Sequence, residues 1–143
     1  MDTEEFSDSL VEGMELWMRV SLQDLMGHLH RKGISMAQIN VLYLLYYRGP
    51  CEVLAFTQTL ALSPAGASQL IERMVRQGWV ERLNDSADRR VRHVHLTESG
   101  RQLVIESIAV RNEWIARFSA RLSSEEKQQV AHVFQLLAEK IEG

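Results

Sequence analysis

The amino-acid sequence predicts a mainly α-helical protein that carries a small β-hairpin. Over most of the 143 residues, apolar side chains recur at the three- and four-residue spacing of amphipathic helices. Glycine, proline and hydroxyl residues divide this pattern into separate helices, and short extended stretches are expected at residues 79–83 and 91–96. Hydrophobic residues make up 45% of the chain and charged residues 24%, which is typical of a globular domain with a sizeable core.

The stretch from residue 63 to residue 78 has the clearest helix boundaries. Ser63 is a favourable N-cap, Pro64 suits the first helical position, and Gly78 suits a left-handed C-terminal cap. One face is apolar at helical spacing, and it comprises Ala67, Leu70, Ile71, Met74 and Val75. The opposite face is small or polar, and it comprises Ala65, Gln69, Glu72, Arg73 and Arg76. Such a helix buries one face and presents the other to solvent or to a partner.

A hairpin with a basic tip is expected directly after this helix. Its turn, residues 84–90, contains Asp85, Asp88, Arg89 and Arg90. This order is the layout of a winged helix-turn-helix, which reads DNA with the helix and touches the backbone or the minor groove with the tip. Charged turn residues can also serve solubility alone, but the outward Gln69, Arg73 and Arg76 favour DNA. Asp88 would repel phosphate, so we expect it to hold a neighbouring arginine.

The rest of the chain is predicted to be helical over residues 7–32, 35–48, 52–60, 97–122 and 123–141. Gly33 ends the first of these helices, and Ser35 caps the second, which a Gly-Pro pair at residues 49–50 interrupts. Thr97 caps the helix after the hairpin, and Ser123 with Glu126 has the spacing of a capping box.

Each of these helices has an apolar face that we expect to be buried. In the helices before residue 63 these faces are Phe6, Leu10, Met14, Trp17, Leu22, Leu25 and Leu29, then Met36, Ile39, Leu42, Tyr43 and Tyr46, then Val53, Leu54, Phe56 and Leu60. In the last two helices they are Leu103, Val104, Ile108, Ile115, Phe118 and Leu122, then Val130, Val133, Phe134, Leu137 and Ile141.

The long terminal helices have little to bury against within one compact chain of this length. We therefore predict an intertwined two-fold dimer in which the terminal helices of both copies share one core. The alternative is that these helices fold back on their own chain. In the dimer interpretation, residues 1–33 and 101–143 form the dimerisation region and residues 34–100 the winged helix-turn-helix, as one continuous structural unit.

The charge of the chain is distributed unevenly. Its net charge is −3, from 16 basic and 19 acidic residues, which is unusual for a protein that binds DNA. Residues 1–33 have a net charge of −4, whereas residues 63–101 hold seven arginines against five acids. Because phosphate contacts depend on the local patch more than on the global sum, the positive charge lies where a DNA contact is expected.

The segment from Leu60 to Leu103, LALSPAGASQLIERMVRQGWVERLNDSADRRVRHVHLTESGRQL, resembles the MarR (multiple antibiotic resistance regulator) family of transcription factors. The order of elements extends this resemblance over nearly the whole chain. The matching features are Ser63 and Ser68 in the recognition helix, Gly78 followed by Val80 and Arg82, the wing residues Asp88, Arg89 and Arg90, and the segment from Leu96 to Gly100. Family wings commonly read Asp-x-Arg-Asp-Arg-Arg, and Ala87 stands here in place of the first arginine.

The resemblance implies a homodimer that binds a roughly palindromic operator in double-stranded DNA. It also implies a repressor that a small ligand or oxidation releases from DNA. Together with the pattern of the helix and the hairpin, it leads us to expect DNA contacts from Ser63, Pro64, Ala65, Ser68, Gln69, Arg73, Arg76, Asp88, Arg89 and Arg90.

The family places effectors between the dimerisation helices and the DNA-binding lobe. The residues of this chain that are expected to line such a cleft are Met14, Trp17, Met18, Tyr43 and Tyr46. These residue types suit a small aromatic or amphipathic effector. The same residues at helical spacing are also typical of an ordinary core, and this alternative stays open.

Other kinds of chemistry find little support in the sequence. Cys51 follows a proline at the start of a helix, where the dipole lowers a thiol pKa, but the chain has one cysteine and we interpret it as an incidental small residue. His28 and His30 lie two apart on a helix, and His93 with His95 lacks the cluster of a zinc site. We therefore expect no metal, no cofactor and no enzymatic activity.

The N-terminal residues are acidic and lack the basic segment of a signal peptide, and no apolar run approaches the roughly 20 residues that span a bilayer. We therefore expect a cytoplasmic protein that binds no membrane. The alternative function is a winged helix that contacts another protein without binding DNA. Arg73, Arg76 and Arg89 argue against it, because such a module needs no basic residues aimed outward from both helix and wing.

Overall fold

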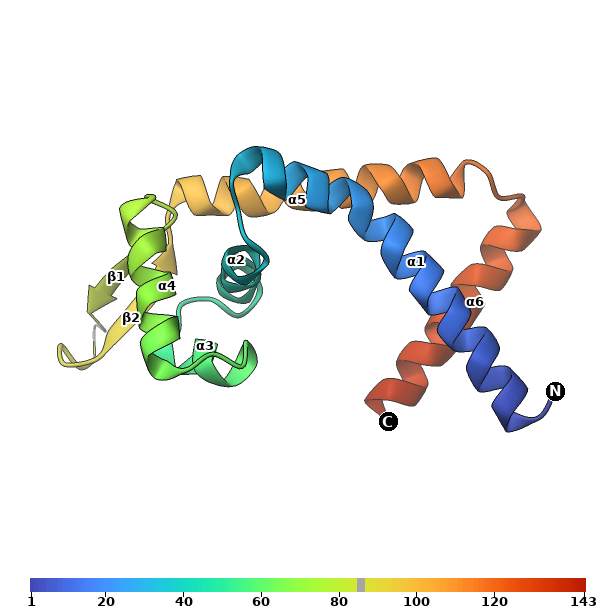
Figure 1. Ribbon diagram of the computed structural model, residues 1–143, viewed down its shortest axis with the longest axis horizontal. Helices are drawn as coiled ribbons and strands as arrows, with labels where there is room; N and C mark the ends of the chain where they lie inside the picture. Colours follow the sequence, from blue (N-terminus) through green and yellow to red (C-terminus); the bar gives the residue numbers. More distant parts are fainter. Residues whose placement is uncertain (85–86) are drawn as a thin grey trace. The chain divides into compact units, whose positions relative to one another are not determined.

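The computed structural model describes residues 1–84 and 87–143, and in these ranges the chain is mainly α-helical with one antiparallel hairpin (Figure 1). The elements are α1 (Thr3–Lys32), α2 (Met36–Arg48), α3 (Val53–Thr59), α4 (Pro64–Arg76), β1 (Val80–Asn84), β2 (Arg92–Leu96), α5 (Glu98–Ser119) and α6 (Ser124–Glu142). The predicted fold class and order of elements are confirmed, with boundaries that shift by a few residues.

The chain forms two compact units. One comprises Met1–Asp24 and Val110–Gly143, and the other comprises Leu25–Ala109. The boundaries fall within α1 and α5, so each of these helices contributes to both units. The expected DNA-binding segment, residues 34–100, lies wholly within the second unit, and the dimerisation role of the terminal helices stays a prediction.

The helix ends follow from local hydrogen bonding. Ser35 and Gln38 form a reciprocal capping box at the start of α2, and Ser123 and Glu126 form another at the start of α6. The Ser63 hydroxyl accepts the Gly66 N–H at 3.0 Å, which satisfies one of the free amides at the start of α4. These contacts confirm the predicted caps.

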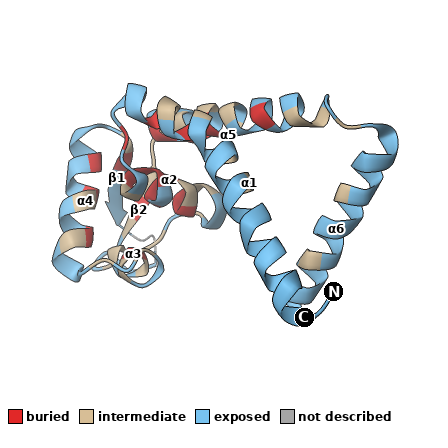
Figure 2. Cartoon of the chain, turned by 45° about the vertical axis from the view of Figure 1, so that its right-hand side comes forward, coloured by how far each residue is buried: buried red, intermediate tan, exposed pale blue. Residues whose placement is uncertain are grey.

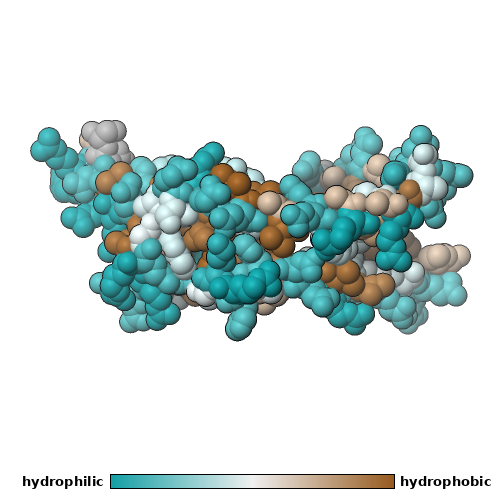
Figure 3. All heavy atoms as spheres, turned by 90° about the horizontal axis from the view of Figure 1, so that it is seen from above, coloured by the Kyte–Doolittle hydropathy of each residue, from teal (hydrophilic) through white to brown (hydrophobic). Residues whose placement is uncertain are grey.

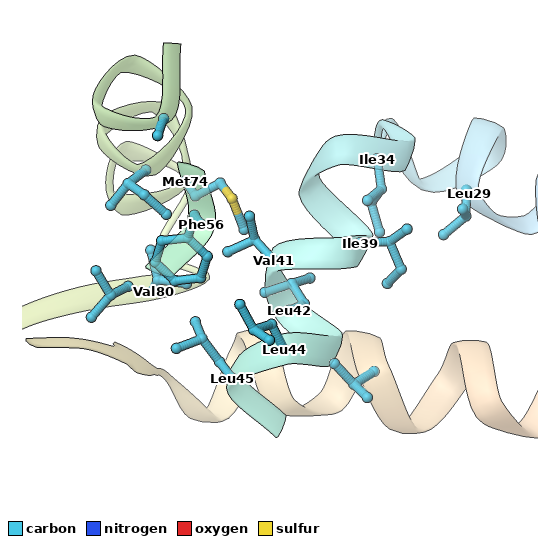
Figure 4. Packing of buried hydrophobic residues seen from close by; sticks show 14 of the residues in the cluster. Leu29, Ile34, Ile39, Val41, Leu42, Leu44, Leu45, Phe56, Met74 and Val80 are labelled. Atoms are coloured by element: carbon cyan, nitrogen blue, oxygen red, sulfur yellow. The ribbon is translucent and has the colours of Figure 1, made fainter. Parts of the chain in front are cut away.

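The second unit has a continuous apolar core. Phe56 of α3, Met74 of α4 and Val80 of β1 lie close together, and the Met74 side chain points towards Val41 of α2 (Figure 4). Figure 2 shows that the buried positions gather on the inner faces of α2 and α4 and at the start of α5. This packing fixes which face of α4 remains at the surface.

The buried face of α2 differs from the predicted one. Val41, Leu44 and Leu45 are buried, whereas Met36 is 42% exposed. Leu54 of α3, also expected inward, is 59% exposed. The cause is that α2 is apolar on most sides and α3 spans two turns, so their spacing alone does not single out the buried face.

The hairpin is extended by a short backbone contact from a distant segment. In its register Val80 lies opposite Leu96 and Arg82 opposite Val94. The Val94 N–H donates to the Cys51 carbonyl at 2.8 Å, and the Cys51 N–H donates to the Val94 carbonyl at 3.3 Å. These two bonds tie β2 to the segment that precedes α3.

Aromatic residues form the centre of the first unit. Trp17 packs edge-on against Trp114 and Phe118, with ring centroids 4.9 and 5.2 Å apart, and lies 5.6 Å from Phe134 of α6. Trp114 is buried, although it was not among the residues expected on the buried face of its helix. In the same unit Arg117 pairs with Asp24.

Helix α6 leaves much of its apolar face exposed (Figure 2). Val133 and Phe134 are each 51% exposed and Ile141 is 82% exposed. In the space-filling view, apolar atoms reach the surface among the polar side chains (Figure 3). Among the described helices, none is both long and apolar enough to cross a membrane.

Candidate nucleic-acid interface

Helix α4 presents a small and polar face to solvent. Its core-facing residues Ala67, Ile71 and Met74 have no exposed area, so the helix cannot rotate about its axis without exposing them. The opposite side therefore stays outward, and its exposed residues are Ser63, Pro64, Ala65, Ser68, Gln69, Glu72, Arg73 and Arg76. This placement agrees with the polar face predicted from helical spacing, whereas Val75, expected on the buried face, is 38% exposed.

The two arginines of this face differ in their surroundings. Arg76 lies 3.6 Å from Glu72 one turn earlier, and both side chains are more than 60% exposed, so the pair contributes little to stability. Within residues 1–84 and 87–143, Arg73 forms no ion pair. Arg73 is thus available to an outside acceptor, whereas Arg76 is partly neutralised.

The wing tip is organised by Asp88. Its carboxylate accepts the Arg90 N–H at 2.9 Å, and the Arg90 Nε lies 3.7 Å from the same oxygen. The Asp88 carbonyl accepts the Val91 N–H at 3.1 Å, which closes the turn. Arg89 between them is exposed. Asp85, which was expected in this turn, lies outside the described residues.

Two further arginines of the wing were not among the predicted DNA contacts. Arg82 and Arg92 are exposed, and the hairpin register places both on the face that carries Val80 and Val94. Strand residues alternate between faces, so the period of two along each strand gives both arginines this placement.

The predicted effector residues have separate local environments. In the first unit, Trp17 belongs to the aromatic cluster, while Met14 and Met18 are exposed. In the second unit, the Tyr43 hydroxyl lies 2.8 Å from the Ser107 hydroxyl, and the Arg101 guanidinium lies 5.1 Å from the centre of the Tyr46 ring. Their assignment to one ligand site stays a prediction.

A hollow of about 300 Å³ lies beside Trp17 in the first unit. Its lining consists of Trp17, Phe118, Gln129, Val130, Val133 and Phe134. Trp17 is therefore the one predicted effector residue that lines this hollow, and the other lining residues come from α5 and α6.

Cys51 has surroundings that disfavour reactivity. Burial raises the pKa of its thiol, and the nearby Arg48 opposes this effect only in part. Its backbone is engaged with Val94, as described above. Within the part of the chain that the structure describes, no three His, Cys, Asp or Glu residues lie close enough to hold a metal ion.

A capped helix with an exposed polar face, followed by a hairpin with a braced basic tip, defines a winged helix-turn-helix protein of the DNA-binding class. A family model described as the MarR family matches residues 34–91. The chain belongs to the MarR family of transcriptional regulators.

Similar proteins extend the match beyond this segment. The transcriptional repressor MdtR of Bacillus subtilis is 26% identical over 140 residues, which cover 95% of this chain and 90% of MdtR. The uncharacterised regulator YsmB of the same organism is 31% identical over 98 residues, which cover 68% of this chain and 67% of YsmB.

A solved structure agrees with the fold over the full length. A MarR family protein from Bacillus stearothermophilus superposes with a TM-score of 0.85 at 22% identity, and the match covers 100% of both chains. The terminal helices therefore belong to the fold as much as the central winged helix does.

Proposed function

We propose that the protein is a homodimeric repressor that binds a roughly palindromic operator with α4 and the wing, and that a small effector releases it. The observation that carries the DNA contact is the outward face of α4, where Arg73 has no acidic partner among the described residues. A module for protein contact alone would need neither this residue nor the basic wing tip.

Helix α4 supplies the contacts to the major groove. Ser63 and Ser68 lie near its start and contact phosphate or base edges, and Pro64 and Ala65 allow the helix a close approach to DNA. Gln69 and Arg73 lie one turn apart on the outward face and meet the bases, where an amide pairs with adenine and a guanidinium with guanine.

The wing supplies the second contact. Arg89 enters the minor groove, while Asp88 and Arg90 hold the turn in one conformation through their hydrogen bond and ion pair. Ala87 replaces a family arginine, so the wing contributes fewer phosphate contacts than a typical family member.

The terminal helices supply the dimer. Val133, Phe134 and Ile141 expose apolar area that another copy would cover, and a two-fold axis would then place two α4 helices against two operator half-sites.

The proposed effector is a small molecule whose binding releases the protein from DNA. A small aromatic or amphipathic molecule suits the apolar hollow beside Trp17, which α5 and α6 line in the first unit.

The test is selection of bound fragments from the source genome, followed by titration of the enriched DNA at several salt concentrations. We expect an inverted repeat with half-sites about 10 base pairs apart and an affinity that falls steeply with salt. Arg89→Ala should lower that slope by roughly one unit, whereas Arg111→Ala, outside α4 and the wing, should leave it unchanged. Absence of any enriched sequence would contradict the proposal.

A further inference from the structure

Gln38 is a buried amide whose two polar atoms are both engaged. The residue is 4% exposed. Its Oε1 accepts the Ser35 N–H at 2.9 Å, which completes the capping box of α2. Its Nε2 donates to the Oε1 of Gln77 at 2.9 Å, across 39 positions of sequence. One side chain therefore joins the start of α2 to the end of α4.

The direction of these bonds follows from the donors available. A backbone N–H can only donate, so the Ser35 contact requires oxygen at that position of the Gln38 amide. The Gln38 nitrogen then faces Gln77, which must accept with its own oxygen. Because buried amides need their partners, both bonds constrain the Gln38 side chain.

Gln77 is the C-cap of α4, so this contact acts on the end of the recognition helix. Its backbone N–H donates to the Arg73 carbonyl at 3.0 Å. Gly78, which follows Gln77, is fixed by a second contact. The Thr97 hydroxyl donates to the Gly78 carbonyl at 2.6 Å. The end of α4 is thus tied to both α2 and the start of α5.

The orientation of α4 matters more for bases than for phosphates. Bidentate contacts to bases require side chains held within a fraction of an ångström, whereas phosphate contacts tolerate small displacements. Arg73 lies one turn before Gln77, so a tilt at the end of α4 displaces it directly.

We propose that Gln38 is a positioning residue for DNA recognition, which holds the end of α4 through Gln77 and sets the angle at which Gln69 and Arg73 meet the bases. This inference rests on the proposed DNA-reading role of α4. If Gln38 has this role, a variant that breaks its bond to Gln77 should discriminate less between operator and unrelated DNA. The affinity of that variant for unrelated DNA should not fall.

The experiment compares Gln77→Met with Gln38→Met in the full-length protein, at a temperature where both variants are folded. Each variant breaks the Gln38–Gln77 bond from a different side. We expect the ratio of operator affinity to non-specific affinity to fall about fivefold in both, which corresponds to the loss of one ordinary hydrogen bond. Non-specific affinity should stay at the wild-type value.

Three further variants separate positioning from other roles. In Gln77→Glu the carboxylate still accepts from the Gln38 nitrogen, so the ratio should return to the wild-type value while the added charge lowers both affinities together. Ser35→Ala weakens the α2 cap but keeps the Gln38–Gln77 bond, so the ratio should not change. The double variant Gln38→Met/Gln77→Met should lose no more than either single variant.

Several results would overturn the inference. If Gln77→Met alone lowers the ratio, Gln77 contacts DNA itself. If both affinities fall together with the melting temperature, Gln38 only stabilises the fold. A wild-type ratio in both methionine variants leaves the proposed function intact and refutes the positioning role alone. A wild-type protein that shows no operator preference refutes the proposed function and this inference together.

Discussion

Asp88 places a negative charge in a wing that is proposed to contact DNA. Its carboxylate is already occupied by the Arg90 N–H and lies near the Arg90 guanidinium, so its role in the structure is to shape the turn. Two physical effects therefore compete at this residue: repulsion of phosphate and bracing of the wing.

We expect Asp88→Ala to weaken DNA binding even though it removes a negative charge, because the loss of the turn disorders Arg89 and Arg90. Titration of operator DNA measures the effect. The control is Asp88→Asn, which keeps an oxygen acceptor for the Arg90 N–H and should bind at least as well as wild type. Tighter binding by Asp88→Ala would show that Asp88 acts only as a charge.

Arg73 is the residue of α4 that we propose to read a base. Arg73→Ala should cost about 1–3 kcal/mol of operator binding and relax the sequence preference at one position of each half-site. Arg73→Lys keeps the charge but loses the bidentate geometry, so it should relax the preference with a smaller loss of affinity. Binding to a panel of single-base operator variants measures both effects, and an equal loss across the panel would make Arg73 a phosphate contact.

At the scale of elements, the junction between the hairpin and α5 leaves no room for a side chain at Gly100. A Cβ there would overlap the Trp79 carbonyl oxygen and lie 3.2 Å from the Leu96 Cδ2. The Gly100 N–H also donates to the Thr97 hydroxyl, so the start of α5 is anchored at the same point as the end of α4.

We expect Gly100→Ala to lower the free energy of unfolding by about 3 kcal/mol, because backbone on both sides of the junction must move. The matched control is Gly13→Ala in α1, where a Cβ meets nothing within 4 Å. Gly13→Ala should raise stability by about 0.5–1 kcal/mol through helix propensity. Thermal or denaturant unfolding measures the stability of both variants. An unchanged free energy of unfolding for Gly100→Ala would contradict a tightly packed junction.

The capping box of α6 predicts a pH dependence. The backbone N–H of Ser123, with a further contribution from its hydroxyl, lowers the pKa of Glu126 below its usual value. A carboxyl with a lower pKa in the folded state contributes stability above its unfolded pKa of about 4.3, and this contribution disappears as the pH falls through the folded pKa. Unfolding of wild type and Glu126→Gln should therefore differ more at neutral pH than at acidic pH, and a difference independent of pH would contradict this role.

At the scale of the whole molecule, the apolar face of α6 is exposed to solvent in the single chain. A surface of this kind is unusual at the end of a monomeric chain, and the proposed dimer accounts for it. Ile141 is the better position at which to test the dimer interface. Leu137 is partly buried within its own chain, whereas Ile141 is exposed.

We expect sedimentation at micromolar concentration to give about twice the chain mass of 16.4 kDa. Leu137→Glu and Ile141→Glu should shift the equilibrium towards monomer, because each buries a charge without a partner in the interface. Ile141 is exposed in the single chain, so Ile141→Glu should not destabilise a monomer. A lower mass in sedimentation, with an unchanged melting temperature of the monomer, would therefore show that the substitution acts on the dimer interface. A stable monomeric wild type would refute the shared core.

The local features of the chain were predictable from the sequence because they depend on neighbours within a few residues. The caps at Ser35, Ser63 and Ser123 need only a hydroxyl and a nearby N–H, and their positions were predicted correctly. The outward face of α4 follows from its strong amphipathic pattern. The predicted site residues on α4 and at the described part of the wing tip are therefore exposed as expected.

The buried faces of the less patterned helices were decided by tertiary packing. Met36 and Leu54 satisfy the helical spacing yet lie at the surface, because α2 and α3 meet their neighbours along a different side. Trp114 became the buried partner of Trp17 for the same reason.

The sequence by itself determined the order of elements, their caps and the outward polar face of α4, since these rest on periodicity and short-range hydrogen bonds. Only the tertiary structure decided that Gln38 holds Gln77, that Thr97 holds Gly78 and that Cys51 pairs with Val94. Each of these contacts joins residues far apart in the chain, and no local preference specifies such a pair. They form because the apolar core brings the elements together and leaves each polar group to find a partner where the packing places it.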